Sequence, residues 1–305
     1  MPLADNLELR KVISMIEGLI VKAISGEYVV LSEGQEYLCK PIGLMRHKGI
    51  NPRVGDKCII SYVDGAYVIN EIKKRKNELI RPYVANVDKV IIVTSLTRPE
   101  LNLNLLDRII CQAEYCDIDI VLVFSKADLV NLNDYQEIIN YYQKIGYKTY
   151  VTPNEASKLA CEFKDAICVL AGQSGVGKSS LLNLLDNELN LKTDDISDAL
   201  GRGKHTTRHT ELFKVNGGFL ADTPGFGALD LEMDEATLGQ MFKEFFALKC
   251  KYNPCFHLSE PGCSVKKALD EGKILKSRYE NYLSFLKEIR DNKNRNIIKN
   301  KEKKK

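Results

Sequence analysis

The residues that most clearly indicate chemistry lie in the middle of the chain, in the run Gly-Gln-Ser-Gly-Val-Gly-Lys-Ser at 172–179. This run fills the phosphate-binding pattern G-x-x-x-x-G-K-[ST] at every fixed position. Its glycines leave room for backbone N–H groups to wrap a triphosphate at close range. Lys178 would reach the β and γ oxygens, and Ser179 would offer its hydroxyl to Mg²⁺. The pattern predicts binding of a nucleoside triphosphate and leaves ATP and GTP open.

A second motif, Ser-Lys-Ala-Asp at 125–128, follows an apolar run. GTP-binding proteins read guanine with Asn-Lys-x-Asp after a strand, because the aspartate accepts from two guanine donors that adenine does not present together. Asp128 would therefore select guanine, and Lys126 would lie along the ring. Ser125 stands where Asn is usual, and its shorter side chain predicts a weaker tie to the phosphate loop. Asp128 also precedes that loop, the reverse of the usual order, so the domain is predicted to be circularly permuted.

Two further polar segments follow the phosphate loop. Residues 201–209 suit a switch that orders around Mg²⁺ and the γ-phosphate, with Thr206 or Thr207 as the metal-contacting hydroxyl. The run Asp-Thr-Pro-Gly at 222–225 fits the pattern in which the aspartate holds Mg²⁺ through water and the glycine N–H senses the γ-phosphate. Phe226 stands where Ras-like proteins carry the water-orienting glutamine. We therefore expect slow intrinsic hydrolysis, completed by His205 or by a group on a partner.

Four potential metal ligands lie near the C-terminus in the spacing Cys250-x₄-Cys255-x-His257-x₅-Cys263. Three thiolates and one imidazole make a complete tetrahedral zinc set. No coordination position stays open, so the predicted zinc ion is structural. Reduced structural cysteines are the alternative interpretation, because the spacing differs from the common C-x₂-C pattern.

The segments around these motifs must position them. Short apolar runs at 89–95, 118–124, 166–171 and 218–221 are typical of buried strands. Apolar stripes at 101–115 and 181–189 are typical of helices. The alternation predicts a parallel α/β sheet in which strand, phosphate loop and helix follow one another.

The N-terminal residues predict a small β-barrel. Five runs rich in β-branched and aromatic residues alternate with turn residues, at 15–21, 27–31, 36–41, 57–63 and 66–72. Asp64-Gly65 favours a type I′ hairpin turn, which requires positive φ at both residues. Five-stranded barrels of this kind are often oligonucleotide-binding (OB) folds, and an SH3-like or purely structural barrel is the alternative.

The composition divides the chain into three parts. We predict an OB-fold RNA-binding barrel at 1–75, a permuted GTPase domain at 76–229 after the basic linker 73–76, and a helical zinc-binding domain at 230–305. Helices are expected at 231–246, 264–271 and 277–290. The tail 287–305 holds nine basic and three acidic residues. It is predicted to be disordered, and either solvated or in contact with phosphate backbone.

Length and composition narrow the class of protein further. The chain has 305 residues, 44% hydrophobic and 28% charged, which excludes a fibre or a disordered chain. Its apolar runs are too short to span a bilayer, and the N-terminus lacks a basic segment leading into an apolar one. Six of the nine cysteines fall in apolar or mixed segments, as reduced core thiols do. We therefore expect a cytoplasmic monomer without membrane contact.

Taken together, the motifs resemble those of the RsgA (YjeQ) family, circularly permuted GTPases of bacterial ribosome assembly. The resemblance covers essentially the whole chain and rests on residues 81–88, 125–128, 172–180, 205–207 and 222–226 and on the four metal ligands. It implies a multidomain α/β protein with an N-terminal OB-fold barrel, a permuted P-loop GTPase domain and a C-terminal helical zinc-binding domain. It further implies binding to the small ribosomal subunit and its 16S rRNA, with GTP hydrolysis that the subunit stimulates.

The resemblance also implies roles for individual residues. GTP or GDP, with Mg²⁺, would be bound by Ser125, Lys126, Ala127, Asp128, Gly172, Gln173, Ser174, Gly175, Val176, Gly177, Lys178, Ser179, Ser180, Thr206 and Asp222. The catalytic positions would be His205, Thr207 and Gly225, and one structural Zn²⁺ would be held by Cys250, Cys255, His257 and Cys263. Thr-Pro-Asn at 152–154 replaces the Ser-Ala-type contact to guanine that the family usually has. With Ser125, this departure predicts looser guanine binding without a change of preference.

Three other functions compete with this hypothesis. A permuted GTPase of the large subunit is disfavoured by the barrel and the cysteine cluster. An RNA-binding scaffold with a vestigial nucleotide site is disfavoured by the intact Lys178, Ser179 and Asp222. A generic ATP-dependent enzyme is disfavoured by Asp128.

Overall fold

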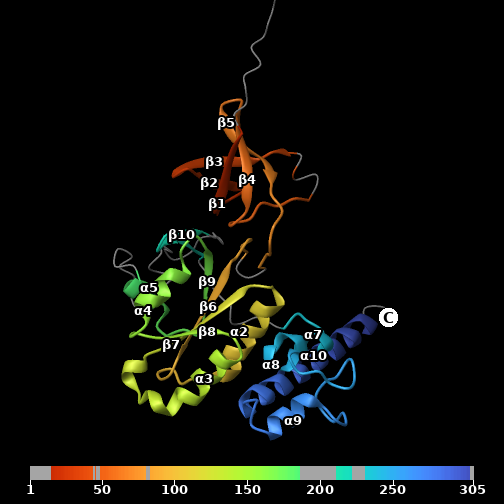
Figure 1. Cartoon of the computed structure of the whole chain (residues 1–305). Coiled ribbons are helices and arrows are strands. Elements are labelled where there is room, and N and C mark those ends of the chain that lie inside the picture. The colour runs from red at the N-terminus through yellow and green to blue at the C-terminus, as the bar shows by residue number, and fades with distance from the viewer. Residues whose placement is uncertain are drawn as a thin grey trace, which may run out of the picture.

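The computed structural model describes residues 15–43, 45, 49–79, 83–185, 211–221 and 231–302. It shows three parts: a β-barrel, an α/β domain built on one sheet, and a helical C-terminal domain (Figure 1). In Figure 1 the barrel lies above the α/β domain, on the side of β10, and the C-terminal domain lies beside α2, away from the barrel.

The N-terminal part is a closed barrel in the strand order β1-β2-β3-β5-β4, so the predicted five-stranded barrel is confirmed. Its strands are β1 (Ile16–Ile24), β2 (Glu27–Ser32), β3 (Gln35–Pro41), β4 (Lys57–Val63) and β5 (Ala66–Ile72). Side chains that alternate along the strands fill the interior, among them the fully buried Ile20, Val30 and Ile60. Asp64 and Gly65 have φ of 49° and 85°, as the predicted hairpin turn requires.

The α/β domain is built on a six-stranded sheet in the order β10-β11-β9-β6-β7-β8. Its strands are β6 (Lys89–Ser95), β7 (Asp119–Ser125), β8 (Lys148–Val151), β9 (Ile167–Ala171), β10 (Leu212–Val215) and β11 (Gly218–Ala221). All neighbouring pairs are parallel except β10 with β11. The predicted parallel sheet is confirmed, with β9 central and its carboxyl end leading into the phosphate loop.

Helices cover both faces of this sheet, because the strands are apolar on both sides. Val90 and Ile92 of β6 point to the face covered by α2 (Leu103–Tyr115) and α3 (Gln136–Lys144). Ile91 and Val93 point to the other face, covered by α4 (Ala156–Leu159) and α5 (Lys178–Leu185). Short 3₁₀ segments complete the connections, η1 (Ala127–Leu129), η2 (Leu132–Tyr135) and η3 (Ala160–Glu162).

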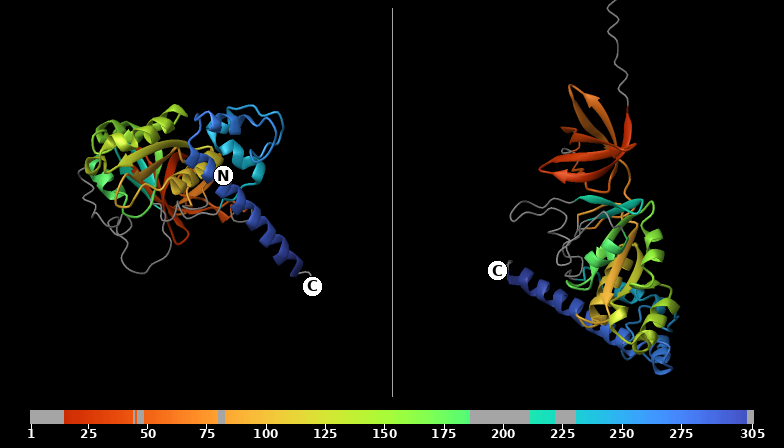
Figure 2. Two further views of the ribbon diagram at one scale, coloured as in Figure 1. Left: turned by 90° about the horizontal axis from the view of Figure 1, so that it is seen from below. Right: turned by 90° about the vertical axis from the view of Figure 1, so that its left-hand side faces the viewer.

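The C-terminal domain contains α7 (Glu235–Leu238), η4 (Gly239–Met241), α8 (Lys243–Phe246), α9 (Ser264–Asp270) and α10 (Lys276–Glu302). The prediction of one helix at 231–246 is wrong, because Phe242 has an extended backbone (φ −102°, ψ 98°) that separates α8 from the turns before it. The prediction that the tail is disordered is also wrong as far as residue 302. Helix α10 continues past 290 because it contains no glycine or proline to end it. Figure 2 shows this helix projecting from the body of the molecule. No helix in the described part of the chain is long and apolar enough to cross a membrane.

The cysteines outside the C-terminal cluster agree only partly with the prediction of core thiols. Cys39, Cys58, Cys111 and Cys168 are buried, and Cys116 is half-buried. Cys161 is exposed, because it lies in the short η3 segment at the surface.

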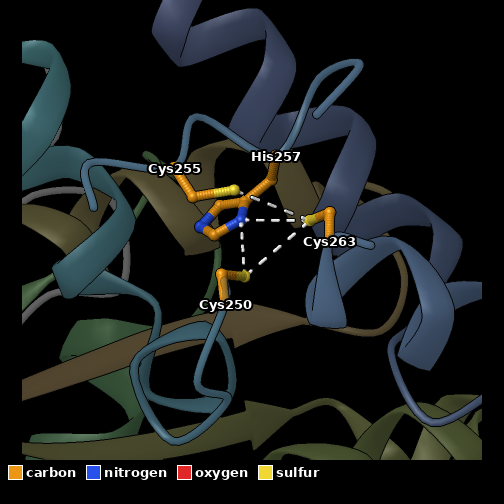
Figure 3. A group of neighbouring side chains, drawn as sticks. All are labelled: Cys250, Cys255, His257 and Cys263. Atoms are coloured by element: carbon orange, nitrogen blue, oxygen red, sulfur yellow. Dashed lines mark hydrogen bonds between the residues drawn. The ribbon is translucent and has the colours of Figure 1, made fainter. Parts of the chain in front are cut away.

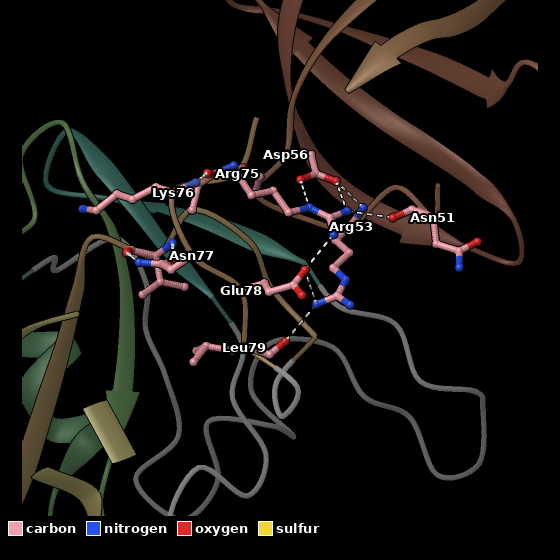
Figure 4. Close-up of polar contacts among 11 residues, drawn as sticks. Asn51, Arg53, Asp56, Arg75, Lys76, Asn77, Glu78 and Leu79 are labelled. Atoms are coloured by element: carbon pink, nitrogen blue, oxygen red, sulfur yellow. Dashed lines mark hydrogen bonds and ion pairs between the residues drawn. The ribbon is translucent and has the colours of Figure 1, made fainter. Parts of the chain in front are cut away.

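The chain between barrel and sheet is held by buried charge (Figure 4). The fully buried Asp56 accepts hydrogen bonds from Nε and Nη2 of Arg75, at 2.7 and 2.9 Å, and from the backbone N–H of Arg53 at 2.7 Å. Lys73 pairs with Glu17 at 2.5 Å and Lys76 with Asp88 at 3.3 Å. Three of the four basic residues of the linker therefore have carboxylate partners within the protein.

Backbone contacts fix the barrel more closely to the α/β domain. The Ala85 N–H donates to the Val54 carbonyl at 2.9 Å. A Cβ at Gly55 would lie 2.0 Å from the Ala85 carbonyl oxygen, so only glycine allows this approach. At the far end of β1, Lys22 forms a β-bridge and a 2.8 Å ion pair with Glu211, immediately before β10. The barrel is thus fastened to the α/β domain at two places.

A buried arginine joins the α/β domain to the C-terminal domain. Arg278 of α10 donates to Asp107 of α2 at 2.7 Å and to both carboxylate oxygens of Glu244 at 2.8 and 3.0 Å. Asp107 also accepts from Asn281 and Tyr142, each at 2.6 Å. Burial opposes the charge of Arg278, but the two carboxylates outweigh it and hold the pKa of Arg278 well above its ordinary value. Both domains therefore share one satisfied ionic network.

Breaking this network should destabilise the joint between the domains. Asp107→Ala leaves Arg278 buried with one carboxylate fewer, and we expect the free energy of unfolding to fall by about 3 kcal/mol. Lys158→Ala is the control, since it breaks an ion pair whose lysine side chain is 71% exposed and should cost below about 1 kcal/mol. Urea unfolding of the metal-loaded protein measures both, and equal losses would contradict the prediction.

Candidate functional site

The phosphate loop connects the end of β9 to the start of α5. Gly172 has φ of 139°, and a Cβ there would lie 2.1 Å from the carbonyl oxygen of Val93 on the neighbouring strand β6. Gly175 and Gly177 also have positive φ, at 79° and 96°. The glycines of the motif are thus required by backbone conformation and by close approach, as the sequence pattern indicated.

Some side chains of the phosphate loop are exposed and others are buried under it. Lys178 donates from Nζ to the carbonyl oxygens of Gly172 and Gln173, at 2.8 and 2.9 Å, so its ammonium group lies across the loop. Val176 and Ser179 are buried beneath it. The exposed members of the predicted set are Gln173, Ser174, Gly175 and Ser180.

The structure brings the predicted base-reading segment against this loop. Lys126 has a left-handed backbone (φ 60°) and donates from Nζ to the Gly175 carbonyl oxygen at 2.7 Å and to the Arg98 carbonyl oxygen. Asp128 is exposed, and no side chain of the described residues pairs with its carboxylate. The two motifs, some forty residues apart in sequence, form one continuous surface.

Ser125 holds these two segments together. Its hydroxyl donates to the Val176 carbonyl oxygen at 2.6 Å and lies 3.3 Å from the Thr94 carbonyl oxygen, in a buried position. The short side chain therefore reaches the loop, because β7 ends close to it, and whether this tie is weaker than that of an asparagine stays a prediction.

The segment at 152–154 supports the base-reading residues through its backbone. The Ala127 N–H donates to the Thr152 carbonyl oxygen at 3.1 Å, and the Thr152 N–H donates to the Phe124 carbonyl oxygen at 2.9 Å. Thr152 is buried. This segment therefore positions Ala127, and through it the residue that follows, Asp128.

A pocket beside the phosphate loop contains polar residues that were not predicted as site residues. The pocket is lined by Thr94 and Ser95 at the end of β6, by Glu100 and Asn102 before α2, and by Gln173. Asn102 caps α2 by accepting from the Leu105 N–H at 2.9 Å. The asparagine before an apolar helical stripe is a capping signal that could have placed the start of α2 here.

The remaining predicted nucleotide and catalytic positions lie outside the described residues. They are His205, Thr206, Thr207, Asp222, Gly225 and Phe226.

The four predicted metal ligands converge in the C-terminal domain (Figure 3). Their donor atoms all lie within 4.8 Å of one another. Cys263 Sγ is 3.9 Å from the sulfurs of Cys250 and Cys255, and His257 Nδ1 is 3.4 Å from Cys263 Sγ and 3.7 Å from Cys250 Sγ. Zinc–sulfur bonds of about 2.3 Å at tetrahedral angles would place two sulfurs about 3.8 Å apart. The cluster therefore fits a tetrahedral metal ion of zinc's size.

Neighbouring groups shape the loop that carries His257. Glu260 accepts from the backbone N–H groups of Phe256 and Leu258, at 2.8 and 2.7 Å. Tyr279 of α10 donates to the His257 carbonyl oxygen at 2.6 Å. Burial lowers the pKa of His257, which favours the neutral imidazole that binds metals. The cluster is thus supported by the same helix that carries Arg278.

Comparison with known proteins matches both the barrel and the α/β domain. The model of the RsgA N-terminal domain matches residues 17–66, and that of the RsgA GTPase matches residues 69–232. The small ribosomal subunit biogenesis GTPase RsgA of Geobacillus kaustophilus (strain HTA426) is 45% identical over 296 residues, which cover 92% of this chain and 100% of that protein. The chain belongs to the RsgA GTPase family. It is therefore a GTPase, and the resemblance found in the sequence is confirmed.

Two solved structures extend the agreement to the fold. YloQ, described as a circularly permuted GTPase, aligns with a TM-score of 0.79 at 36% identity over 92% of this chain and 96% of its own. YjeQ from Thermotoga maritima aligns with a TM-score of 0.79 at 34% identity over 90% and 99%. A model named 50S ribosome-binding GTPase matches residues 167–301, starting at β9 rather than at the start of the domain. This starting point agrees with the permuted order of the motifs.

Removing the Ser125 hydroxyl tests the tie between the two nucleotide motifs. Ser125→Ala leaves the buried Val176 carbonyl oxygen without this donor, and we expect about 1 kcal/mol weaker binding of both GTP and GDP, about fivefold in Kd. Calorimetric titration measures it, with Ser157→Ala at an exposed position of α4 as control. Unchanged affinity in Ser125→Ala would show that the hydrogen bond does not position the site.

Proposed function

We propose that this protein acts in late maturation of the small ribosomal subunit, binds 16S rRNA, and hydrolyses GTP faster when the subunit is bound. One observation carries the proposal: relatives named for small-subunit biogenesis match over nearly their whole length, so barrel, GTPase domain and metal domain are all shared. We place the domain boundaries at 75/76 and 229/230. Such work belongs in the cytoplasm, and we expect the protein to act as a monomer.

The nucleotide site supports GTP as the substrate. Backbone N–H groups of residues 172–180 would surround the phosphates, and Lys178 would exchange the loop carbonyl oxygens for the β and γ oxygens. The unpaired Asp128 carboxylate would accept from guanine, with Lys126 along the ring. Ser125, Ala127 and the loop residues that flank Lys178 would hold this arrangement in place.

Residues on three segments would hold Mg²⁺ and assist hydrolysis. Ser179 would bind the ion, together with Thr206 or Thr207 and, through water, Asp222. The ion would neutralise charge that develops on the phosphate oxygens. Gly225 would sense the γ-phosphate, and His205 or a group on the ribosomal partner would orient the attacking water in place of the glutamine that Phe226 replaces.

We further propose that the C-terminal cluster holds one structural Zn²⁺. Three thiolates and an imidazole at tetrahedral separations are the donor set that zinc takes in closed sites. The ion would tie the α8–α9 connection to the base of α10 and so stabilise the fold of this domain.

A role on the large subunit has less support. The model named for 50S binding matches only residues 167–301, whereas the RsgA relatives match about nine tenths of the chain. A scaffold with a vestigial nucleotide site is also disfavoured, because the phosphate-loop pattern, Lys178 and Asp128 are all intact in the sequence.

Hydrolysis with separated subunits tests the proposed function. We expect small subunits to raise GTP turnover at least about tenfold, because the partner supplies what the site lacks at Phe226, and large subunits to leave it unchanged. Lys178→Ala should abolish the stimulated rate. Stimulation by large subunits, or stimulated turnover that survives Lys178→Ala, would overturn the proposal.

Zinc content tests the metal site. The wild-type protein should contain about one zinc ion per chain, and Cys255→Ser should lose it and lower the melting temperature of the C-terminal domain. Cys161→Ser is the matched control, since this exposed cysteine lies outside the cluster and its loss should leave the zinc content unchanged. A metal-free wild-type protein that stays folded would refute the assignment.

A further inference from the structure

We propose that four residues around the metal ligand Cys250, namely Phe246, Lys249, Lys251 and Tyr252, form a binding surface for single-stranded RNA. We call them the aromatic–basic surface. The inference rests on the proposed role in RNA-containing subunits and adds a contact site that this role does not specify.

Two aromatic rings of this surface are exposed without a cover. Phe246 is 72% exposed and Tyr252 is 42% exposed, although both lie in a small domain with an aromatic core. The preceding residue, Phe245, is buried in that core and stacks on Phe242 with ring centroids 4.9 Å apart. The core of the domain therefore buries Phe242 and Phe245, whereas Phe246 and Tyr252 stay exposed among the described residues.

The two lysines of the surface form no ion pair with a carboxylate of the described residues. Both Lys249 and Lys251 are exposed. Elsewhere in the domain Lys243 pairs with Glu114 at 3.1 Å and Lys273 with Glu271 at 2.6 Å. The Lys251 ammonium instead lies 5.7 Å from the ring centroid of Tyr252. Cation and ring thus stand side by side.

The nearest acidic residues in the sequence are already used. None occurs between Glu244 and Glu260. Glu244 is bound by the buried Arg278, and Glu260 accepts from two backbone N–H groups of its own loop. Lys249 and Lys251 therefore have no free carboxylate in their own segment, and such cations attract phosphate.

The backbone that carries these side chains is fixed. The Ser264 hydroxyl donates to the Lys249 carbonyl oxygen at 2.7 Å, and Cys250 between the two lysines belongs to the metal cluster. A surface held in this way loses little entropy when it binds.

Single-stranded RNA fits this combination of side chains. Bases stack on exposed rings without regard to sequence, and neighbouring cations contact the phosphate backbone of the RNA. An apolar protein partner would fit less well, because two cations without counter-charges would be buried with the rings.

The absence of tryptophan from the chain allows a local test. Phe246→Trp and Tyr252→Trp each place one reporter on the surface, and stacking by bases should quench its fluorescence when a twelve-nucleotide uridine RNA is added to the zinc-loaded, full-length protein. Tyr115→Trp is the matched control, since Tyr115 is 50% exposed but lies on α2, and its reporter should stay unquenched.

Charge is tested in the Phe246→Trp background. Lys249→Gln with Lys251→Gln should weaken RNA binding at least about fivefold and lower the slope of log affinity against log salt by about 1.4, about 0.7 for each lysine. Lys273→Gln, which removes a paired lysine, should change neither value. Zinc content and basal GTP turnover check that each variant is folded.

The outcomes separate this inference from the proposed function. Absence of quenching at both positions, or equal affinity in the double-glutamine variant, overturns the RNA surface even where small subunits stimulate the wild type. Loss of subunit binding in the double-glutamine variant, with RNA binding unchanged, indicates a protein partner and also overturns it. Quenching without subunit stimulation would remove the proposed function and leave the surface standing.

Discussion

The buried guanidinium of Arg278 is the constraint on which the arrangement of the C-terminal domain depends. It lies between carboxylates of two domains, Asp107 on α2 and Glu244 on α8, and among the described residues neither carboxylate forms an ion pair with another cation. Arg108 of α2 adds a pair of hydrogen bonds to Glu288 of α10. Separating the domains would leave these charges without their partners, so α2 and α10 behave as parts of one unit.

Helix α2 also borders the nucleotide site. Residues just before α2 and in its first turns line the pocket next to the phosphate loop, while Asp107 in the same turns meets α10. On the other side, the barrel is bound to Glu211, which follows the predicted switch segment directly in the chain. Both outer domains are therefore anchored to elements that follow or border segments predicted to bind the nucleotide. A ligand-dependent change in either element would act on surfaces proposed to contact RNA.

Local patterns predicted the elements well where a period or a turn determined them. Strand alternation, the Asp64-Gly65 turn and the apolar strands of the sheet recur in the structure within a few residues. The failures occurred where long-range contacts or the absence of a breaker decided the outcome. Phe242 leaves the helix although its neighbours favour one, and α10 continues through a polar, basic segment that was expected to be disordered.

The sequence by itself determined the phosphate-loop pattern, the aspartate predicted to read guanine, the permuted order and the four predicted metal ligands, because each depends on residue types at short fixed spacings. Only the tertiary structure showed that Ser125 reaches Val176 across the end of β6, that Arg75 of the basic linker pairs with the buried Asp56, and that α2 contacts the C-terminal domain as well as its own sheet. These contacts join residues from about twenty to more than one hundred and seventy positions apart. No local pattern carries such pairings, since they arise when separate elements pack against one another.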